Sequence, residues 1–149
     1  MAQSQSEVRG FRAVLTTIGV VYVLLASSML VRGARVMRDF AVPESVVSAP
    51  VFADFFSFFY QLMALVGVLT VLFGRVTRER SAQLLVARVF CAASVLLTLR
   101  DLSTSDSSLG NHLYRGSATL IPVAIDLTIA IAFGLLALGG LRPARSPIV

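Results

Sequence analysis

The sequence has few of the residue types on which soluble proteins and many catalytic sites depend. It has no Lys, no Trp, one Cys and one His, and only 14% of its 149 residues are charged. Soluble domains usually carry nearer a quarter charged residues. Cys91 has no second cysteine, so a disulfide within the chain is excluded, and Cys91 with His112 is too small a set for a His/Cys metal cluster. We therefore expect no metal and no cofactor.

The basic residues are all arginines, and their positions indicate what they contact. The net charge is +5 and the isoelectric point is about 10.7, which is the first sign of a nucleic-acid-binding protein. The arginines, however, cluster at the ends of apolar stretches, where such side chains extend toward lipid headgroups. We therefore expect contact with a lipid bilayer and none with nucleic acid.

Apolar residues are abundant and fall in long runs. They make up 56% of the chain, and the mean hydropathy is +0.83. Four stretches lie at about residues 11–31, 51–74, 82–99 and 118–141, and a helix needs about 20 residues to cross a bilayer. The sequence predicts an all-α fold: an integral membrane four-helix bundle of antiparallel helices with short loops, forming a single transmembrane domain over residues 1–149.

Prolines and short connections predict where the helices end. We expect the first helix to continue past the membrane to about Phe40, with Pro43 breaking it. Pro50 suits the first turn of the next helix. The connection at 75–81 is so short that the second and third helices are expected to be antiparallel neighbours.

The distribution of arginines predicts the orientation of the chain. Arg9 and Arg12 would also suit a signal peptide, but the first apolar run is long, and we expect an uncleaved anchor. Seven arginines lie on the side of the termini and four in the opposite loops: Arg9, Arg12, Arg75, Arg78, Arg80, Arg142 and Arg145 against Arg32, Arg35, Arg38 and Arg115. The positive-inside rule then places both termini on the cytoplasmic or inner side of a bacterial inner membrane or an organellar membrane.

An aromatic stripe marks the second apolar stretch. Phe52, Phe55, Phe56 and Phe59 follow helical spacing, and Tyr60 lies beside them. One interpretation is packing against another helix or lipid near the membrane interface. The other is a surface that stacks on a flat ligand, such as a quinone or a sterol, or that contacts a partner subunit.

Polar residues inside the apolar stretches predict a polar layer. Asp126 lies eight residues past Ala118, roughly 12 Å into the fourth stretch, where a carboxylate costs on the order of 3 kcal/mol. It therefore needs a partner or a proton. By the same arithmetic Gln61, Ser94 and Thr98 lie at a similar depth, and we predict an ion pair between Arg88 and Asp126.

The third apolar stretch has a face of small residues. Ala87, Cys91, Ser94 and Thr98 lie one turn apart on one side of the predicted helix. Small residues of this kind let membrane helices approach closely.

Two interpretations of the polar layer remain open. It is either a set of hydrogen bonds that fixes helix packing, or a ligand pocket or ion path, because ionisable residues inside a membrane are functional candidates. A proton relay usually needs more than one carboxylate, and the sequence offers one at depth. No dinucleotide, phosphate-loop, zinc-protease or nucleophile-elbow motif is present.

Three functions are compatible with this pattern, and the sequence leans away from an enzyme. The first is a non-catalytic accessory, scaffold or assembly subunit of a larger membrane complex, bound to other subunits or to itself. The second is a membrane-embedded binder, carrier or enzyme for a hydrophobic small molecule such as a lipid. The third is a small oligomeric channel or a proton-coupled transporter.

Overall fold

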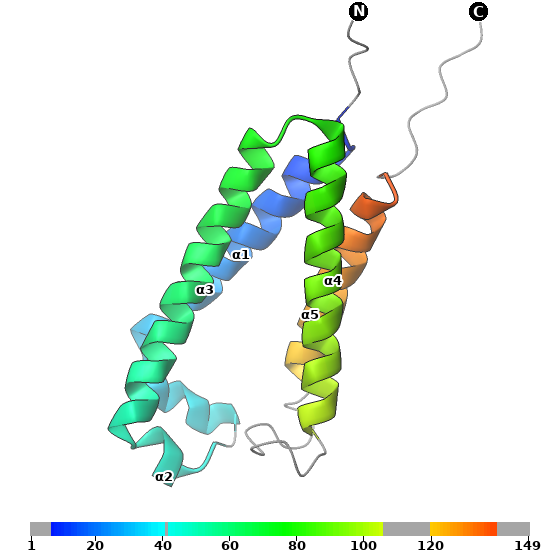
Figure 1. The fold of residues 1–149 in the computed structure, drawn as a ribbon. Coiled ribbons are helices and arrows are strands. Elements are labelled where there is room, and N and C mark those ends of the chain that lie inside the picture. The colour runs from blue at the N-terminus through cyan, green and yellow to red at the C-terminus, as the bar shows by residue number, and fades with distance from the viewer. Residues whose placement is uncertain (1–6, 41, 106–119, 140–149) are drawn as a thin grey trace, which may run out of the picture.

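The computed structural model describes residues 7–40, 42–105 and 120–139, and these residues form helices and no strand (Figure 1). Four long α-helices are joined by short segments, the first of which holds a 3-10 helix and a single α-helical turn. In chain order the helices are α1 (Phe11–Arg32), η1 (Ala34–Phe40), α2 (Glu44–Val47), α3 (Pro50–Val76), α4 (Arg80–Ser105) and α5 (Leu120–Ala137).

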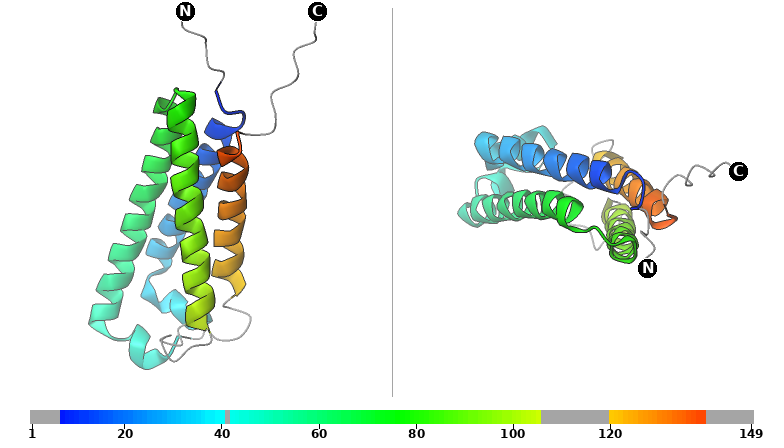
Figure 2. Two further views of the ribbon diagram at one scale, coloured as in Figure 1. Left: turned by 45° about the vertical axis from the view of Figure 1, so that its right-hand side comes forward. Right: turned by 90° about the horizontal axis from the view of Figure 1, so that it is seen from above.

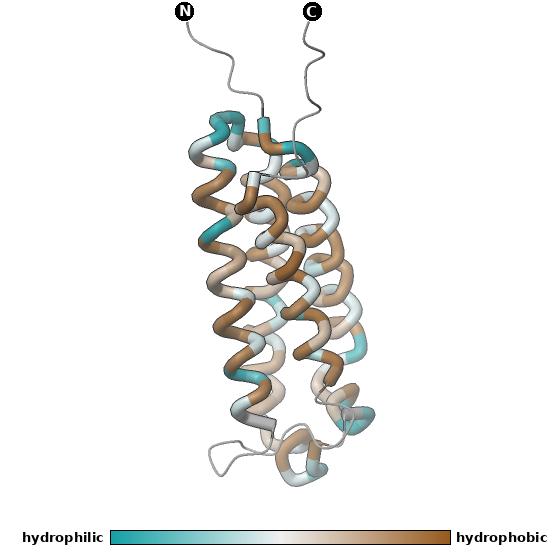
Figure 3. The backbone as a smooth tube through the Cα atoms, turned by 90° about the vertical axis from the view of Figure 1, so that its right-hand side faces the viewer, coloured by the Kyte–Doolittle hydropathy of each residue, from teal (hydrophilic) through white to brown (hydrophobic). Residues whose placement is uncertain are grey.

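All four long helices are long and apolar enough to cross a membrane. Even α5, with 18 residues, covers about 27 Å, close to the roughly 30 Å of a hydrocarbon core. Hydrophilic residues gather at both ends of the molecule and hydrophobic ones between them (Figure 3). The predicted all-α membrane bundle is confirmed. Residues 118–119 and 140–141 of the predicted fourth span lie outside the described residues.

The long helices alternate in direction, so the molecule has two distinct ends (Figures 1 and 2). Helices α1 and α4 begin at one end, where residues 77–79 connect α3 to α4, and we call this the turn end. Helices α3 and α5 begin at the opposite end, which also holds η1 and α2, and we call this the loop end.

The first helix ends earlier than predicted. It stops at Arg32 because Gly33 has a φ of 70°, a left-handed conformation that glycine adopts without a steric penalty. The Gly33 N–H donates a hydrogen bond to the Met29 carbonyl, which satisfies one free carbonyl of the last turn. The expected extension of this helix to Phe40 is therefore wrong. Pro50 does occupy the first turn of α3, as predicted.

The segment after Gly33 folds back over the loop end of α3. The η1 and α2 residues Val36, Met37 and Val47 are buried together with Phe56 of α3. Two ion pairs involve acidic residues of this segment: Arg32, the last residue of α1, pairs with Asp39 at 2.8 Å, and Arg38 pairs with Glu44. Both pairs are exposed, so each contributes little to stability. The buried apolar cluster is what holds the segment in place.

Helices α1 and α3 form a closely packed pair. Gly19 of α1 and Gly67 of α3 meet at the crossing, where a Cβ on Gly19 would lie 2.5 Å from the Gly67 carbonyl oxygen. Nearer the turn end, Leu15 packs against Gly74, where a Cβ on the glycine would lie 3.0 Å from the Leu15 Cβ. Such contacts need small residues, because membrane helices associate mainly through close packing.

Helices α4 and α5 form the second pair through the predicted small-residue face. Ala87, Ser94 and Thr98 are buried on α4. Cys91 lies between them, and its Sγ donates a weak hydrogen bond to the Ala130 carbonyl at 3.5 Å. A small-residue face toward a neighbouring helix is thus confirmed for the third span.

The two pairs contact each other chiefly near the turn end. A core cluster there joins Leu15 of α1, Ala87 of α4 and Phe133 of α5. Toward the loop end the pairs diverge, and α3 and α4 separate from the turn that connects them (Figures 1 and 2). The expectation that these two helices are packed neighbours is wrong, because the small-residue face of each is directed at another helix.

Candidate functional site

The polar partner of Asp126 is a second carboxyl group, contributed by α4. Asp126 lies six residues into α5, about 9 Å from its start. Its side chain is hydrogen-bonded to the side chain of Asp101. Two ionised carboxylates offer only acceptors, so this bond requires a proton on one of them. The pair is therefore a candidate proton-binding site near the loop end of a membrane span.

Two further polar groups lie close to the carboxyl pair. The Arg100 guanidinium is 3.8 Å from a carboxylate oxygen of Asp101 and also exerts an attractive field on Asp126. The phenol of Tyr22, on α1, lies within electrostatic range of Asp126. The core cluster that joins the two helix pairs includes residues of α1, and Tyr22 is the one nearest the loop end. The carboxyl pair thus lies where the contact between the pairs ends.

Ser94 and Thr98 continue the polar side of α4 toward the turn end. Both are buried, at 6% and 8% exposure, and the Thr98 hydroxyl donates to the Ser94 carbonyl at 2.9 Å. A hydroxyl bonded to its own helix four residues back is satisfied without a ligand. These two residues belong to the α4–α5 packing surface on the same face as Asp101.

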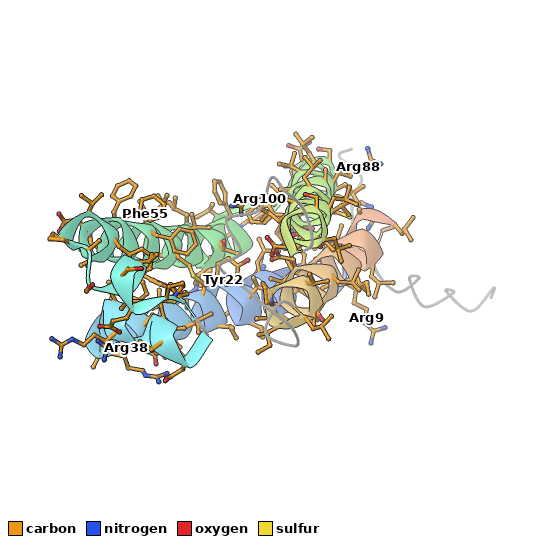
Figure 4. All side chains as sticks on the ribbon, turned by 90° about the horizontal axis from the view of Figure 1, so that it is seen from below. Arg9, Tyr22, Arg38, Phe55, Arg88 and Arg100 are labelled. Carbon is orange, nitrogen blue, oxygen red and sulfur yellow. The ribbon has the colours of Figure 1, made fainter. Side chains whose placement is uncertain are left out.

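The other predicted members of the polar layer lie elsewhere. Gln61 is exposed on α3. Arg88 is exposed on the outer side of α4, well toward the turn end, and points away from α5 (Figure 4). No ion pair joins Arg88 to Asp126 in the described residues. The predicted ion pair does not form because of the helical face on which Arg88 lies. Ala87 faces α5, and the next residue, Arg88, is turned about 100° around the helix axis from it.

The missed residue, Asp101, had a signal in the sequence. It follows Thr98 by three residues and Ser94 by seven, so it continues the small-residue face predicted from the sequence. Asp101 lies just beyond the third predicted span, which ends at about residue 99. Helix α4 instead continues to Ser105, which brings Asp101 onto the face that packs against α5.

The aromatic stripe of α3 divides into two faces. Phe56 is buried under η1 and α2, with Phe52 and Tyr60 packed beside it, and the Phe56 and Tyr60 ring centroids are 4.6 Å apart. Phe55 and Phe59 are exposed, at 63% and 50%, although the Phe59 ring also meets the edge of Tyr60, with ring centroids 5.2 Å apart. The stripe is thus in part a packing surface at the loop end and in part a surface directed at the membrane.

A second buried polar residue, Gln83, was not singled out from the sequence. Its side chain is fully buried at the turn end, where its Oε1 accepts from the Val8 N–H at 2.7 Å and its Nε2 donates to the Thr77 carbonyl at 2.9 Å. It ties the segment before α1 and the α3–α4 connection to α4. Gln83 lies four residues before Ala87 and therefore on the small-residue face, and this spacing was the sequence signal that it is buried.

The described residues contain no group of three His, Cys, Asp or Glu side chains that could hold a metal ion. The carboxyl pair with its neighbouring arginine and tyrosine can hold and release a proton, or bind a cation in its place.

Comparison with protein-family models, with curated proteins and with solved structures finds no match for this chain.

Proposed function

We propose that this protein is a non-catalytic accessory or assembly subunit of a larger membrane complex. The observation that carries the proposal is the divergence of the two helix pairs toward the loop end (Figure 1). Each pair is tightly packed within itself, whereas among the described long helices α3 packs along its length against α1 alone. The exposed side of α3 is therefore a long apolar surface that a helix of another subunit can cover.

The chemistry of that surface favours a helical membrane partner. Phe55, Phe58 and Phe59 are at least half exposed near the loop end of α3, and aromatic side chains supply much of the contact area at protein interfaces. The carboxyl pair of Asp101 and Asp126 lies at the same end of the molecule. A partner helix with a basic or hydrogen-bonding side chain would satisfy both features.

Site-specific photo-crosslinking in native membranes tests this proposal. A photoreactive phenylalanine at Phe59, which is exposed, should give protein adducts of one defined mass. The matched control is the same residue at Phe56, which is buried within the chain and should give none. Native mass spectrometry of the gently extracted protein should show the same mass added. Lipid adducts alone at Phe59, together with a lone monomer in the mass spectrum, would overturn the proposal.

The carboxyl pair favours a second candidate, a proton-coupled channel or transporter. The sequence offered one carboxylate at depth, and the fold places a second one against it. Two carboxyls that share a proton, with a nearby arginine, are a chemically sufficient site for loading and releasing protons.

Proteoliposomes with an internal pH dye test the second candidate. Wild-type protein should dissipate an imposed pH gradient, and Asp126→Asn should stop this without loss of helix content. Asp54→Asn is the matched control, because Asp54 is exposed on α3. An unchanged rate in Asp126→Asn would remove this candidate.

The remaining candidate, a binder of hydrophobic small molecules, has less support. Such a site would combine the aromatic stripe with the predicted polar layer of Asp126, Arg88 and Gln61. The fold distributes these residues over different faces and ends of the molecule.

A further inference from the structure

Arg88 is a charged residue inside a membrane span that faces outward. It lies eight residues into α4, about 12 Å from the start of the helix, in the stretch Arg80–Ser103 that is able to span a membrane. Its side chain is exposed on the outer side of the helix (Figure 4). Its neighbours along that side, Leu85 and Val89, are exposed apolar residues at 63% and 57%.

The described part of the chain supplies no anionic partner for Arg88. The guanidinium forms no ion pair and no hydrogen bond to any of these residues. The nearest acid toward the turn end, Glu79, accepts a hydrogen bond from Ser81. The nearest acid toward the loop end, Asp101, lies on the opposite face with Asp126.

An unpaired guanidinium in hydrocarbon is costly, so Arg88 needs an anion from outside the described residues. Charged residues at the centre of a membrane helix cost about 3 kcal/mol even on insertion scales. In an α-helix the Cα–Cβ bond tilts toward the N-terminus, which directs Arg88 toward the turn end. That end is positively charged: Arg75 and Arg78 flank the turn, are exposed, and have no acidic partner in the described residues.

We propose that Arg88, with the turn-end arginines Arg75 and Arg78, binds the phosphate of an anionic membrane phospholipid. The lipid chains would lie along the apolar outer side of α4, beside Leu85 and Val89. Arginine suits this ligand because its planar fork donates two parallel hydrogen bonds to phosphate oxygens. Several arginines at one end favour a lipid with net negative charge over a zwitterionic one. Arg88, the residue that the test below changes, lies on α4, whereas the proposed partner surface lies on α3.

Native mass spectrometry with defined lipids tests the site. The delipidated full chain is titrated with dioleoyl phosphatidylglycerol, and separately with dioleoyl phosphatidylcholine. The wild type should retain the anionic lipid preferentially. Arg88→Gln should bind phosphatidylglycerol about fivefold more weakly, the loss expected for one charge-assisted contact at a partly solvated site. Arg88→Lys should fall between the two.

Arg35→Gln is the matched control, because it removes the same charge from an exposed residue at the loop end. It should bind phosphatidylglycerol as the wild type does. Circular dichroism should show equal helix content in all variants, since Arg88 is exposed. Equal phosphatidylglycerol binding by wild type and Arg88→Gln would overturn the proposal. A second result would also overturn it: Arg88→Gln loses a bound protein subunit while its lipid binding is unchanged. Arg88 would then contact a carboxylate of that subunit and not a lipid phosphate.

Discussion

At the scale of single residues, Asp126 is stabilised by a carboxyl group of the helix against which α5 packs. The hydrogen bond to Asp101 needs one shared proton, and Arg100 limits the negative charge of the group. A carboxyl pair with a proton is far less costly inside a membrane than two free charges. The pair also explains why an aspartate is tolerated in an otherwise apolar helix.

The shared proton gives a spectroscopic prediction. The infrared spectrum of the wild type at neutral pH should contain a C=O stretch from a protonated carboxyl group. Asp126→Asn should remove this band, because the amide can then donate to an ionised Asp101. Asp54→Asn should leave it in place, since Asp54 is exposed on α3. A wild-type spectrum without the band would contradict the carboxyl pair.

Gln83 gives a prediction for stability. Gln83→Leu removes the hydrogen bonds to the Val8 N–H and the Thr77 carbonyl and leaves both groups short of a partner at a buried position. The free energy of unfolding should fall by about 2 kcal/mol. Titration with a denaturing detergent, followed by circular dichroism, measures this change. Gln61→Leu, at an exposed position, should change it little, and equal effects of the two substitutions would argue against the tether.

At the scale of the helices, the crossing of α1 and α3 depends on two glycines. Gly19→Leu would place a side chain where even a Cβ lies 2.5 Å from a backbone oxygen, so the helices must move apart. We expect a loss of about 1–3 kcal/mol in unfolding free energy. In Gly134→Ala the new Cβ lies 3.7 Å from the Cys91 sulfur, an ordinary contact that should be tolerated. Equal stability of both variants in detergent titration would contradict the close crossing.

The helices themselves were predictable, because each apolar run is long enough to require a membrane span. The packing face of α4 was also predictable from the spacing of Ala87, Cys91 and Ser94. The end of α1 was not predicted, because Pro43 was expected to be the first residue that stops the helix, whereas Gly33 stops it ten residues earlier. The Arg88–Asp126 pair failed because depth alone was considered, whereas the helical face decides which side chains meet.

At the scale of the whole molecule, the sequence did not show which helices pair. Antiparallel order allows several arrangements of four helices, and a short turn appeared to favour α3 beside α4. The actual pairs follow from side-chain volume: the glycines of α3 face α1, and the small residues of α4 face α5. Comparing the small-residue faces of all four helices, and not only of helices adjacent in the sequence, would have indicated these pairs.

The orientation in the membrane stays a prediction. The excess of arginines at the turn end places that end on the inner side. In a Cys91→Ser background, Val51→Cys at the loop end should react with an impermeant maleimide added to intact cells or vesicles of native orientation. Val76→Cys at the turn end should react only after permeabilisation. Both residues are exposed, so the reverse pattern would mean the opposite topology.

Two helix pairs join at the turn end and diverge at the loop end. Distance measurements between spin labels in lipid nanodiscs test this arrangement. In the Cys91→Ser background, one label pair is placed at Phe73 and Leu85, near the turn end, and another at Phe58 and Leu99, near the loop end. All four side chains are exposed. If the pairs diverge, the distance is clearly longer for the Phe58–Leu99 pair. Similar distances at both ends would instead mean that the four helices form a closed bundle.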